Sequence, residues 1–465
     1  MIFGRENELA ALNDLYEKGE FQFAVIYGRR RVGKTRLIQE FCQDKKSVFY
    51  VAIEQNDVEA LRQFTEVIKQ SFQQDETLAF IDNFQNWDAA LRFVANKAKS
   101  EQIVLVIDEY PYLVNSNKSL PSQIQKLIDQ VFKKSQLFLI LCGSSMSFME
   151  NEVLNYKSPL YGRWTAQFKI RPLDYFDSIK ILSRWKPIEQ LYGYAVAGGV
   201  PQYLLTLADH SNFRNAVTQS ILNPRGILFE EPMNLMKQEM REPAIYNSII
   251  KAIASGASRQ KDISDAIHED SKKIANYLTA LIDLEIIEKQ YPLDAPDRKK
   301  VIYRLKDNLF AFWYRFIPKA LSLIEMGFAE ETYEKMIEPY FSDYFGYIFE
   351  DISTQYLLRK NREKKLPQVF HRFGKWWGQD PIKKTAEEID IVASNDHMAL
   401  FAECKWRNQK MSLRVFETLK YKSQLTQKNK DKIYYLFSKS GFTMDLVRLQ
   451  NNDLGLVSVD DILNV

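Results

Sequence analysis

The stretch FQFAVIYGRRRVGKTRLIQEFCQ, residues 21–43, constrains the fold of this chain more than any other segment. Residues 21–27 are almost wholly apolar, which predicts a short buried strand, and residues 36–43 have the apolar spacing of a helix. The loop between them, GRRRVGKT at residues 28–35, matches the pattern GxxxxGK followed by Ser or Thr. A strand, this loop and a helix in succession predict a phosphate-binding loop in a parallel α/β sheet.

The loop offers three kinds of group to a bound nucleotide. Gly28 and Gly33 let the backbone curl so that its N–H groups point at phosphate oxygens, beside the N-terminus of the helix. Lys34 is expected to reach the β- and γ-phosphates, and the Thr35 hydroxyl is expected to ligate Mg²⁺. The predicted nucleotide-binding residues of this segment are Gly28, Arg29, Arg30, Arg31, Val32, Gly33, Lys34, Thr35 and Arg36.

A second apolar run, IVLVIDEYPYL at residues 103–113, predicts a central strand that is buried on both faces. It ends in Asp108 and Glu109, at the carboxyl edge where parallel sheets bind ligands. Asp108 is expected to hold Mg²⁺, and Glu109 to orient and polarise the attacking water, so hydrolysis is predicted as well as binding. A third buried run, LFLILCGSS, ends in Ser144 and Ser145, either of which could sense the γ-phosphate or serve only as a helix cap.

The stretch PLYGRWT places Arg163 in a loop beyond the last sheet elements, where an arginine finger would lie. The alternative is that Arg163 pairs with a structural carboxylate. Both interpretations stay open from the sequence.

Six segments in order resemble the archaeal-type ATPase family, which belongs to the AAA+/STAND region of P-loop NTPases. They are FGRENELAAL (residues 3–12), YGRRRVGKT, IDEYPYL, CGSS, LYGR and AGGVPQYL, and the resemblance covers roughly residues 1–235. It implies that the nucleotide is ATP and that the protein is an Mg²⁺-dependent ATPase. It also implies that Gly4 and Arg5 neighbour the adenine, and that Pro201, in a helical lid, contacts the nucleotide.

After Pro243 the pattern changes to three short amphipathic helices and two strands around a turn at Asp294–Asp297, which predicts a winged helix-turn-helix. Its third helix would be the one to enter a DNA major groove. Residues 251–306 carry 11 basic and 9 acidic residues, and the third helix offers two lysines and an asparagine but no arginine. Such a helix has few side chains suited to reading DNA bases, so a role of the winged helix in protein interaction or as a lid stays open.

The stretch EEIDIVASNDHMALFAECKW, residues 387–406, predicts a hairpin with acids inside its strands. With Asn395 and Asp396 at the centre of the turn, Asp390 would face Phe401, and Glu403 would be the diagonal neighbour of Asp390 on the same sheet face. Lys405 would share that face, because side chains alternate along a strand. Two carboxylates and the Cys404 carbonyl could bind Mg²⁺.

This hairpin belongs to a longer predicted order of helix, three strands, helix and strand, in which Glu350 lies on the first helix and WWG forms a rigid aromatic turn. Residues 241–465 resemble the C-terminal domain of unknown function that accompanies archaeal-type ATPases. Its end resembles the PD-(D/E)XK nucleases, although Ile389 stands where that family often has a proline. The resemblance implies a nuclease-like site of Glu350, Asp390, Glu403 and Lys405, with Asp390 and Glu403 as metal ligands. The alternative is a degenerate domain kept for DNA binding or packing.

The composition is that of a globular protein with several cores, since 46% of the 465 residues are hydrophobic and 26% are charged. No apolar run approaches the roughly 20 residues of a membrane span, and no secretory signal is predicted. Three distant cysteines favour a reducing cytoplasm. Residues 351–440 carry 19 Lys and Arg against 10 Asp and Glu, whereas the net charge of the whole chain is only +3. This basic region predicts contact with a polyanion, most simply DNA.

The predicted fold class is a multidomain α/β protein: a P-loop NTPase parallel sheet with a helical lid, a winged helix-turn-helix, and a C-terminal restriction-endonuclease-like α/β domain. The predicted function is an ATPase coupled to a DNA-binding and DNA-cleaving module. The alternative is a STAND-type switch whose winged helix and tail bind protein or DNA without cleavage. Assembly into a homo-oligomer stays open. The predicted domains are 1–170 (ATPase core), 171–240 (lid), 241–310 (winged helix), 311–340 (helical linker) and 341–465 (nuclease-like).

Overall fold

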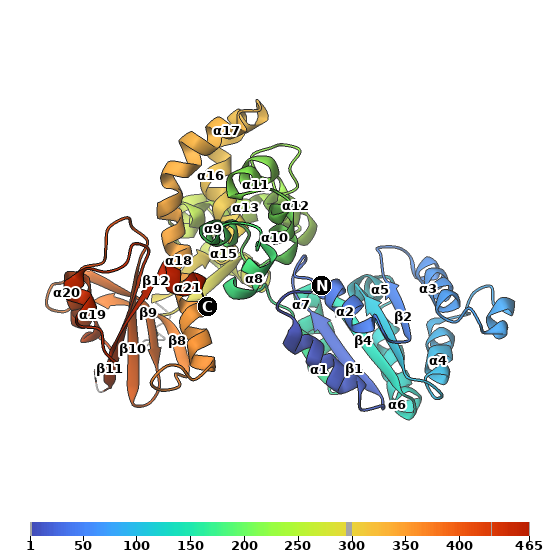
Figure 1. Ribbon diagram of the computed structural model, residues 1–465. Coiled ribbons are helices and arrows are strands. Elements are labelled where there is room, and N and C mark those ends of the chain that lie inside the picture. Colours follow the sequence, from blue (N-terminus) through green and yellow to red (C-terminus); the bar gives the residue numbers. More distant parts are fainter. Residues whose placement is uncertain (1, 294–299, 429, 465) are drawn as a thin grey trace. The chain divides into compact units, whose positions relative to one another are not determined.

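The computed structural model describes residues 2–293, 300–428 and 430–464. The chain divides into two compact units. Unit 1 comprises Met1–Leu173 and Val200–Gln202, and unit 2 comprises Asp174–Gly199 and Tyr203–Val465 (Figure 1). The predicted α/β fold class is confirmed: unit 1 contains a parallel sheet, and unit 2 contains a separate mixed sheet.

Unit 1 is built on a five-stranded parallel sheet with the order β2-β3-β4-β1-β5. Every residue of β1, β3 and β4 is buried, as the continuous apolar runs predicted. Alternate residues of these strands belong to two cores, one on each face of the sheet. The strands are β1 (Gln22–Tyr27), β2 (Ser47–Val51), β3 (Ile103–Asp108), β4 (Leu137–Gly143) and β5 (Ala166–Lys169).

The sheet order decides which polar groups meet at its carboxyl edge. Because β4 lies between β1 and β3, the residues that follow β4 lie between the loop after β1 and the acids at the end of β3. The main helices of unit 1 are α1 (Glu6–Tyr16), α2 (Lys34–Cys42), α3 (Asp57–Ser71), α4 (Trp87–Lys97), α5 (Tyr110–Ser116) and α6 (Leu120–Gln130).

Unit 2 begins with a helical region and continues into three short helices and a two-stranded antiparallel sheet. The first region contains α8 (Tyr175–Ile181), α9 (Pro187–Ala197), α10 (Pro201–Ala208, whose first two residues belong to unit 1), α11 (Phe213–Ser220) and α12 (Glu231–Glu239). The hairpin module, as we call residues 243–305, contains α13 (Pro243–Ala254), α14 (Gln260–Ile267), α15 (Ser271–Asp283), β6 (Ile287–Gln290) and β7 (Ile302–Leu305).

The element order of the hairpin module follows the sequence prediction. α15 begins at Ser271 because the Asp270 side chain accepts hydrogen bonds from the N–H groups of Lys272 and Lys273. Lys272, Lys273 and Asn276 are exposed on α15. The turn expected at Asp294–Asp297 lies outside the described residues.

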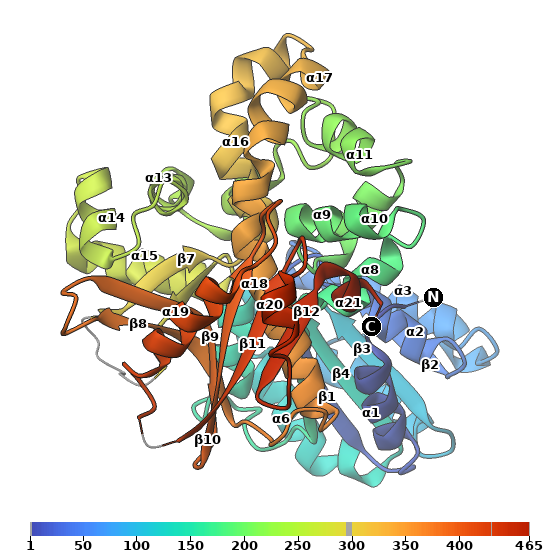
Figure 2. The ribbon, with the colours of Figure 1, turned by 60° about the vertical axis from the view of Figure 1, so that its left-hand side comes forward.

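Two long helices follow, α16 (Asn308–Glu325) and α18 (Glu338–Arg362), joined by a short α17 (Ala329–Thr332) and a π-helical turn. Aromatic side chains connect them: the ring of Tyr344 on α18 packs edge-on against Phe312 and Phe316 on α16. α18 then runs along the mixed sheet, where it contacts β9 and β10 (Figure 2).

The mixed sheet has the order β12-β11-β10-β9-β8 and is packed against α19 (Leu413–Ser423). β9 is antiparallel to both neighbours, whereas β10, β11 and β12 are mutually parallel. The predicted aromatic turn at WWG is wrong, because Trp376, Trp377 and Gly378 pair with β9 inside a strand. The strands are β8 (Arg372–Gln379), β9 (Ala386–Ser394), β10 (Met398–Lys405), β11 (Asp431–Ser438) and β12 (Leu454–Ser458).

The register of the β9–β10 hairpin differs from the predicted one by two residues. Ile391 pairs with Ala402 and Val392 with Phe401, so Asp390 stands opposite Glu403 and not opposite Phe401. The cause is Asn395, whose side-chain oxygen accepts hydrogen bonds from the N–H groups of His397 (2.9 Å) and Met398 (2.8 Å). Asn395 is therefore the first residue of the turn and not a central one. A register shift of two residues leaves each side chain on the same face of the sheet, so Asp390, Glu403 and Lys405 still share one face, as predicted.

Candidate nucleotide site and carboxylate cluster

The loop between β1 and α2 has the backbone conformation that its glycines predict. Gly28 and Gly33 have positive φ angles of 155° and 90°. A Cβ atom on Gly28 would lie 2.2 Å from the Ile170 carbonyl oxygen, so a larger residue could not be accommodated without moving the backbone after β5. Gly33 immediately precedes α2, so the loop leads directly into a helix N-terminus, which favours a bound anion.

Lys34 is buried at this helix N-terminus and points back into the loop. Its Nζ donates hydrogen bonds to the carbonyl oxygens of Gly28 (2.8 Å) and Arg29 (3.0 Å). Burial lowers the pKa of Lys34, and the nearby acids Glu109 and Asp108 oppose that shift. A buried cation beside turned backbone N–H groups is suited to binding phosphate oxygens.

Thr35 and Asp108 meet across the sheet edge. The Thr35 hydroxyl donates a hydrogen bond of 2.6 Å to Oδ2 of Asp108, whose residue is 1% exposed. The other carboxylate oxygen of Asp108 accepts from the N–H of Glu109 at 2.9 Å. The structure thus brings together the two residues that the sequence predicted as metal ligands.

Glu109 has an αL backbone, with φ 52° and ψ 41°, which is uncommon for a residue with a Cβ atom. Its Oε2 accepts a hydrogen bond from the Ser144 hydroxyl at 2.9 Å and lies 3.3 Å from the Ser144 amide nitrogen, which also donates to it. Ser144 follows the strand between the phosphate-binding loop and Glu109, so the sheet order creates this contact. Ser144 is therefore a partner of Glu109 and not a helix cap.

Arg5 connects the N-terminal segment to the phosphate-binding loop. Its guanidinium donates hydrogen bonds to the carbonyl oxygens of Val32 (3.1 Å) and Arg171 (2.5 Å), and the residue is buried. The preceding Gly4 has a φ of 60°. On the other side of the loop, Cγ of Pro201 lies 3.9 Å from where a Cβ atom of Gly33 would be. The three residues that the resemblance assigned to the nucleotide therefore lie at or next to this loop.

The arginines of the loop have different surroundings. Arg29 is buried, and Arg30 donates a hydrogen bond of 3.2 Å to the Tyr112 hydroxyl. Arg31 has a positive φ of 71°, and Arg36 forms an exposed ion pair with Glu40 on α2 at 3.3 Å. Direct contact of these four side chains with nucleotide stays a prediction.

Arg163 does not lie at the nucleotide site of its own chain, and it pairs with a carboxylate, as the second of its two predicted interpretations states. Its guanidinium pairs with Asp129 at the end of α6, with Nη2 2.8 Å from Oδ2, and also donates to the Pro159 carbonyl. Two residues later, the N–H of Thr165 bonds to the carbonyl of Phe23 near the start of β1. Arg163 is thus near the amino edge of the sheet, whereas the phosphate-binding loop is at the carboxyl edge.

A second cluster of charged residues lies on the mixed sheet of unit 2. Asp390 of β9 accepts a hydrogen bond of 2.8 Å from the N–H of Cys404, the residue after Glu403. Oε2 of Glu403 is buried and accepts no hydrogen bond from the described residues, and Oε1 accepts from Lys405 Nζ at 2.6 Å. The predicted residues Asp390, Glu403 and Lys405 therefore converge on one face of the sheet.

Two lysines that the sequence analysis missed complete this cluster. Lys375, at a bulge in β8 between Gly374 and Trp376, forms an ion pair with Glu350 of α18. Lys422 of α19 lies 3.9 Å from the free oxygen of Glu403 and donates to the Glu388 carbonyl at 2.9 Å. The spacing of lysines along the chain carries no signal for either contact, because the bulge and the helix packing create them.

Burial and mutual repulsion raise the pKa values of two of the acids. Burial raises the pKa of Glu350 to about 7, with a further increase from Asp390 that the Lys375 ammonium opposes. Burial also raises the pKa of Glu403, again with repulsion from Asp390. Burial lowers the pKa of Lys405, but Glu403 and Asp390 outweigh it and the net shift is upward. The cluster thus contains one acid, Glu350, that exchanges a proton near neutral pH, beside the Lys375 and Lys405 ammonium groups, whose pKa values are raised.

A parallel sheet with a phosphate-binding loop, a buried Lys and Thr, and an Asp–Glu pair at the end of a neighbouring strand defines the class of P-loop ATPases. Residues 2–207 match the ATPase domain family found predominantly in Archaea, and residues 313–433 match a family described as archaeal bacterial proteins of unknown function. The chain belongs to the family of archaeal-type ATPases that carry this C-terminal domain.

Two relatives agree with this assignment, and a solved structure has a similar fold. An uncharacterized protein of Methanocaldococcus jannaschii, MJECL04, is 32% identical over 442 residues, which cover 94% of this chain and 94% of that protein. An uncharacterized ATP-binding protein of the same organism, MJ0423, is 41% identical over 46 residues, or 10% of this chain and 78% of that protein. The Walker-type ATPase PABY2304 of Pyrococcus abyssi has a similar fold, with a TM-score of 0.54 and 20% identity over 68% of this chain and 96% of that chain.

The chain is therefore an ATP-binding P-loop protein with ATPase activity. None of the helices within residues 2–293, 300–428 and 430–464 combines the length and apolarity that a bilayer crossing requires.

Proposed function

We propose that the chain couples Mg²⁺-dependent ATP hydrolysis in unit 1 to binding and cleavage of DNA at the carboxylate cluster of unit 2. The observation that carries the proposal is the opposition of Asp390 and Glu403 across the β9–β10 hairpin, with Lys405 hydrogen-bonded to Glu403. Opposed carboxylates and a lysine on one sheet face are a suitable arrangement for hydrolysing a phosphodiester with a divalent cation.

The ATP site has residues that fit a magnesium ion. The hydroxyl of Thr35 and the carboxylate of Asp108 are 2.6 Å apart, and both are hard oxygen ligands of the kind that Mg²⁺ prefers. Mg²⁺, when bound there, neutralises charge on the β- and γ-phosphates. Glu109 is then the residue that orients the attacking water, and Lys34 binds the phosphate oxygens.

The carboxylate cluster also has a donor set for a divalent cation. It consists of Asp390, Glu403 and the Cys404 carbonyl. The buried Oε2 of Glu403 accepts no hydrogen bond from the described residues and has only the Lys422 ammonium, 3.9 Å away, as an ionic neighbour. No group of three or more His, Cys, Asp or Glu side chains in the described ranges has metal-binding geometry, so the backbone carbonyl would be needed. A bound cation supplies Lewis acidity. Lys405 is placed to donate to the phosphate, and Glu350, with a pKa near 7, to accept or release a proton.

Exposed cations of the basic region 351–440 support contact with DNA. Most of the cations of the basic region 351–440 that are not used in the cluster lie at the surface, where they can contact phosphates without losing a buried partner. Exposed examples are Arg362, Lys364, Lys365, Lys383, Lys384, Arg407 and Lys410. The order of the hairpin module supports its interpretation as a winged helix, and its nearly balanced charge favours the basic region as the main DNA contact.

The decisive experiment measures cleavage of plasmid and branched DNA with Mg²⁺ or Mn²⁺, with and without ATP. Wild type is compared with Asp390→Ala and Lys34→Ala. We expect Asp390→Ala to lose cleavage while keeping ATPase activity, and Lys34→Ala to lose ATPase activity and any ATP dependence of cleavage. Cleavage that survives Asp390→Ala would rule out the assigned site.

The second candidate is a STAND-type ATP-driven switch whose unit 2 binds protein or DNA without cleavage. It is favoured by the contacts that the acids already make, since Glu350 is paired with Lys375, and Glu403 with Lys405. Salt-sensitive DNA binding without cleavage under any metal condition would support this candidate. The domain boundaries 1–170, 171–240, 241–310, 311–340 and 341–465, homo-oligomerisation and a cytoplasmic location remain predictions.

A further inference from the structure

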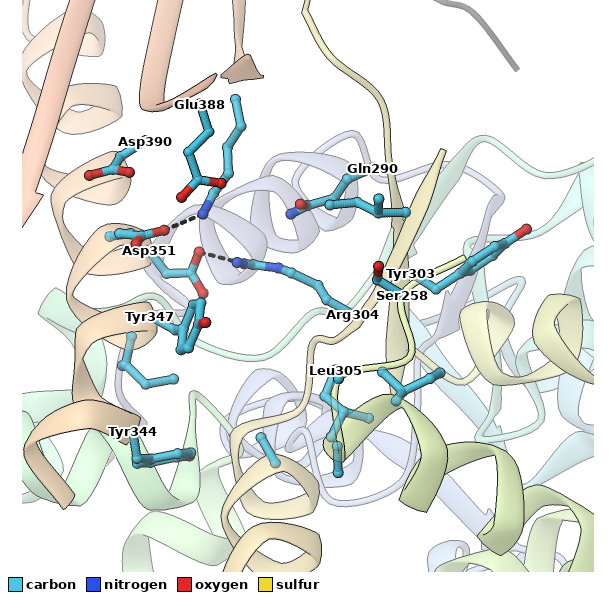
Figure 3. A pocket seen from close by; sticks show the side chains of 18 of the residues that line it. Ser258, Gln290, Tyr303, Arg304, Leu305, Tyr344, Tyr347, Asp351, Glu388 and Asp390 are labelled. Atoms are coloured by element: carbon cyan, nitrogen blue, oxygen red, sulfur yellow. Dashed lines mark hydrogen bonds and ion pairs between the residues drawn. The ribbon is translucent and has the colours of Figure 1, made fainter. Parts of the chain in front are cut away.

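Unit 2 contains a cavity of about 630 Å³ where the hairpin module, α18 and the strands β8 and β9 meet. Figure 3 shows Gln290 and Arg304 on the hairpin-module side and Tyr347 and Asp351 on α18. Trp377 of β8 also lines the cavity. The cavity exists only because the hairpin module and the mixed sheet meet there.

The walls of the cavity are held in place by contacts between its three sides. Arg304 of β7 pairs with Glu288 of β6 and with Asp351 of α18, the latter at 2.5 Å. The indole N–H of Trp377 donates to the Lys300 carbonyl at 3.2 Å, and the N–H of Leu293 donates to the Lys375 carbonyl at 2.9 Å. These contacts fix the cavity before any ligand arrives, which lowers the entropic cost of binding.

The chemistry of the lining favours a planar, uncharged, hydrogen-bonding ligand. Three carboxylates (Asp351, Glu388 and Asp390) face three cations (Arg304, Arg315 and Lys375), and Glu350, with a pKa of about 7, adds part of a negative charge at neutral pH. The lining therefore has no excess of positive charge to attract a phosphate inside. The rings of Tyr347 and Trp377 offer stacking faces, and the amide of Gln290 offers both a donor and an acceptor. Aromatic rings that stack and an amide that hydrogen-bonds are the groups that proteins use to bind an unstacked nucleobase.

The cavity is continuous with the carboxylate cluster, because Glu350 and Asp390 belong to its wall. A base in the cavity would thus belong to a nucleotide whose phosphate lies near Asp390. We propose that this cavity receives one unpaired nucleotide next to the phosphate held at the cluster, so that the preferred DNA has a flap, a junction or a single-stranded end. The proposal rests on the proposed DNA-directed function of the cluster and names its substrate class.

The test is a binding measurement on the full chain carrying Asp390→Asn, so that cleavage does not interfere. Fluorescence anisotropy compares a duplex with a single-stranded flap against a blunt duplex of the same sequence. Tyr347→Ala removes a stacking ring that is 64% exposed, and Tyr347→Phe keeps it. Tyr340→Ala is the matched control, since Tyr340 is also an exposed tyrosine of α18 (55%) but does not line the cavity.

We expect tighter binding of the flap DNA than of the blunt duplex, and an approximately tenfold loss of that preference in Tyr347→Ala, in line with stacking contributions of about 1–3 kcal/mol per base. Tyr347→Phe and Tyr340→Ala should keep the preference. Equal binding of both DNAs by the parent protein, or an unchanged preference in Tyr347→Ala, would overturn the proposal.

The outcomes separate this proposal from the cleavage proposal. If the wild type cleaves no DNA but the flap preference depends on the Tyr347 ring, the cavity is assigned correctly and the nuclease assignment fails. Suppose instead that the wild type cleaves blunt and flapped DNA equally, and that the Tyr347 variants bind the two DNAs with the same preference as the parent protein. The cleavage proposal then stands and the cavity proposal fails.

Discussion

The Ser144 hydroxyl donates a hydrogen bond of 2.9 Å to Oε2 of Glu109, across the end of the strand that separates Glu109 from the phosphate-binding loop. The Ser144 N–H donates to the same oxygen at 3.3 Å. Glu109 is also fixed by its αL backbone and by the bond from its own N–H to Asp108. The carboxylate proposed to orient the attacking water is thus held from both ends.

Replacing Ser144 with Ala should lower the kcat of ATP hydrolysis about tenfold and leave KM for ATP nearly unchanged. Only one of the two hydrogen bonds to Glu109 is lost, because the Ser144 N–H remains. Glu109→Gln is the reference and should lose about 10²- to 10⁴-fold in kcat while still binding ATP, as expected for a general base. Steady-state kinetics and nucleotide-binding measurements test both variants. If the Ser144→Ala enzyme keeps the wild-type kcat, Ser144 does not position Glu109.

Replacing Arg163 with Ala should leave kcat within about twofold of wild type. The loss of an arginine finger lowers kcat about 10³- to 10⁵-fold, but Arg163 is paired with Asp129 near the other edge of the sheet. The stability cost should be small, about 0–1 kcal/mol, since both partners are partly exposed. A large fall in kcat in the Arg163→Ala enzyme, together with a wild-type kcat that rises with protein concentration, would instead show that Arg163 acts on a second copy of the chain.

Replacing Asn395 with Ala should destabilise unit 2 by about 2–4 kcal/mol. The side chain accepts two hydrogen bonds in the turn and donates two more, to Gln368 (2.8 Å) and to the Val369 carbonyl (3.0 Å). The neighbouring Asp396 is exposed, so Asp396→Ala should change the free energy of unfolding by less than about 0.5 kcal/mol. Chemical denaturation measures both, and equal effects would contradict the observed turn.

The free energy of unfolding should fall as pH rises from about 4.5 to about 7. Glu350 has a pKa of about 7 in the folded chain against a usual 4.5, so the folded state binds more protons than the unfolded state in this interval. Stability must then decrease with increasing pH there. The raised pKa of Lys375 acts only above its usual value of 10.5, outside this interval.

The Glu350→Gln variant should show a shallower decline over that pH interval, with the smaller remaining slope coming from Glu403, whose pKa is also raised. Denaturant unfolding at several pH values gives the slopes. The slope, and not the absolute stability, is the readout, because the variant also leaves Lys375 without its partner carboxylate. An identical slope in the two proteins would show that Glu350 titrates normally.

The sequence predicted the parts of the structure that local patterns decide. The apolar runs before Gly28, Asp108 and Ser144 are shorter than typical buried helices and are followed by a glycine or polar residues, which favours buried strands. The grouping of Glu403 and Lys405 on one face was also predictable, since side chains alternate along a strand. Asp390 joins that face in the predicted register as well, because the predicted and observed registers differ by an even number of residues.

The features that were missed depend on long-range contacts. The register depends on which hydrogen bonds the Asn395 side chain makes, and Asn395 also binds residues 368 and 369 on the segment before β8. The pairing of Arg163 with a carboxylate was one of two open interpretations, but its partner, Asp129, lies 34 residues earlier and could not be named from the sequence. Lys375 enters the cluster only because β8 has a bulge at that point. The periodicity of apolar residues along the sequence does not predict contacts between side chains that lie far apart in the chain.

The bridge between Pro292 and Lys375 has a consequence for the solubility of the protein. β8 is an edge strand of the mixed sheet and carries two adjacent tryptophans, and an open strand of this kind is a template for pairing with another chain. The hairpin module covers that edge where β8 bulges, with a proline that cannot donate a backbone hydrogen bond. A shortened chain that keeps the mixed sheet but lacks residues 241–307 would expose the edge, and it should aggregate while the full chain stays dispersed.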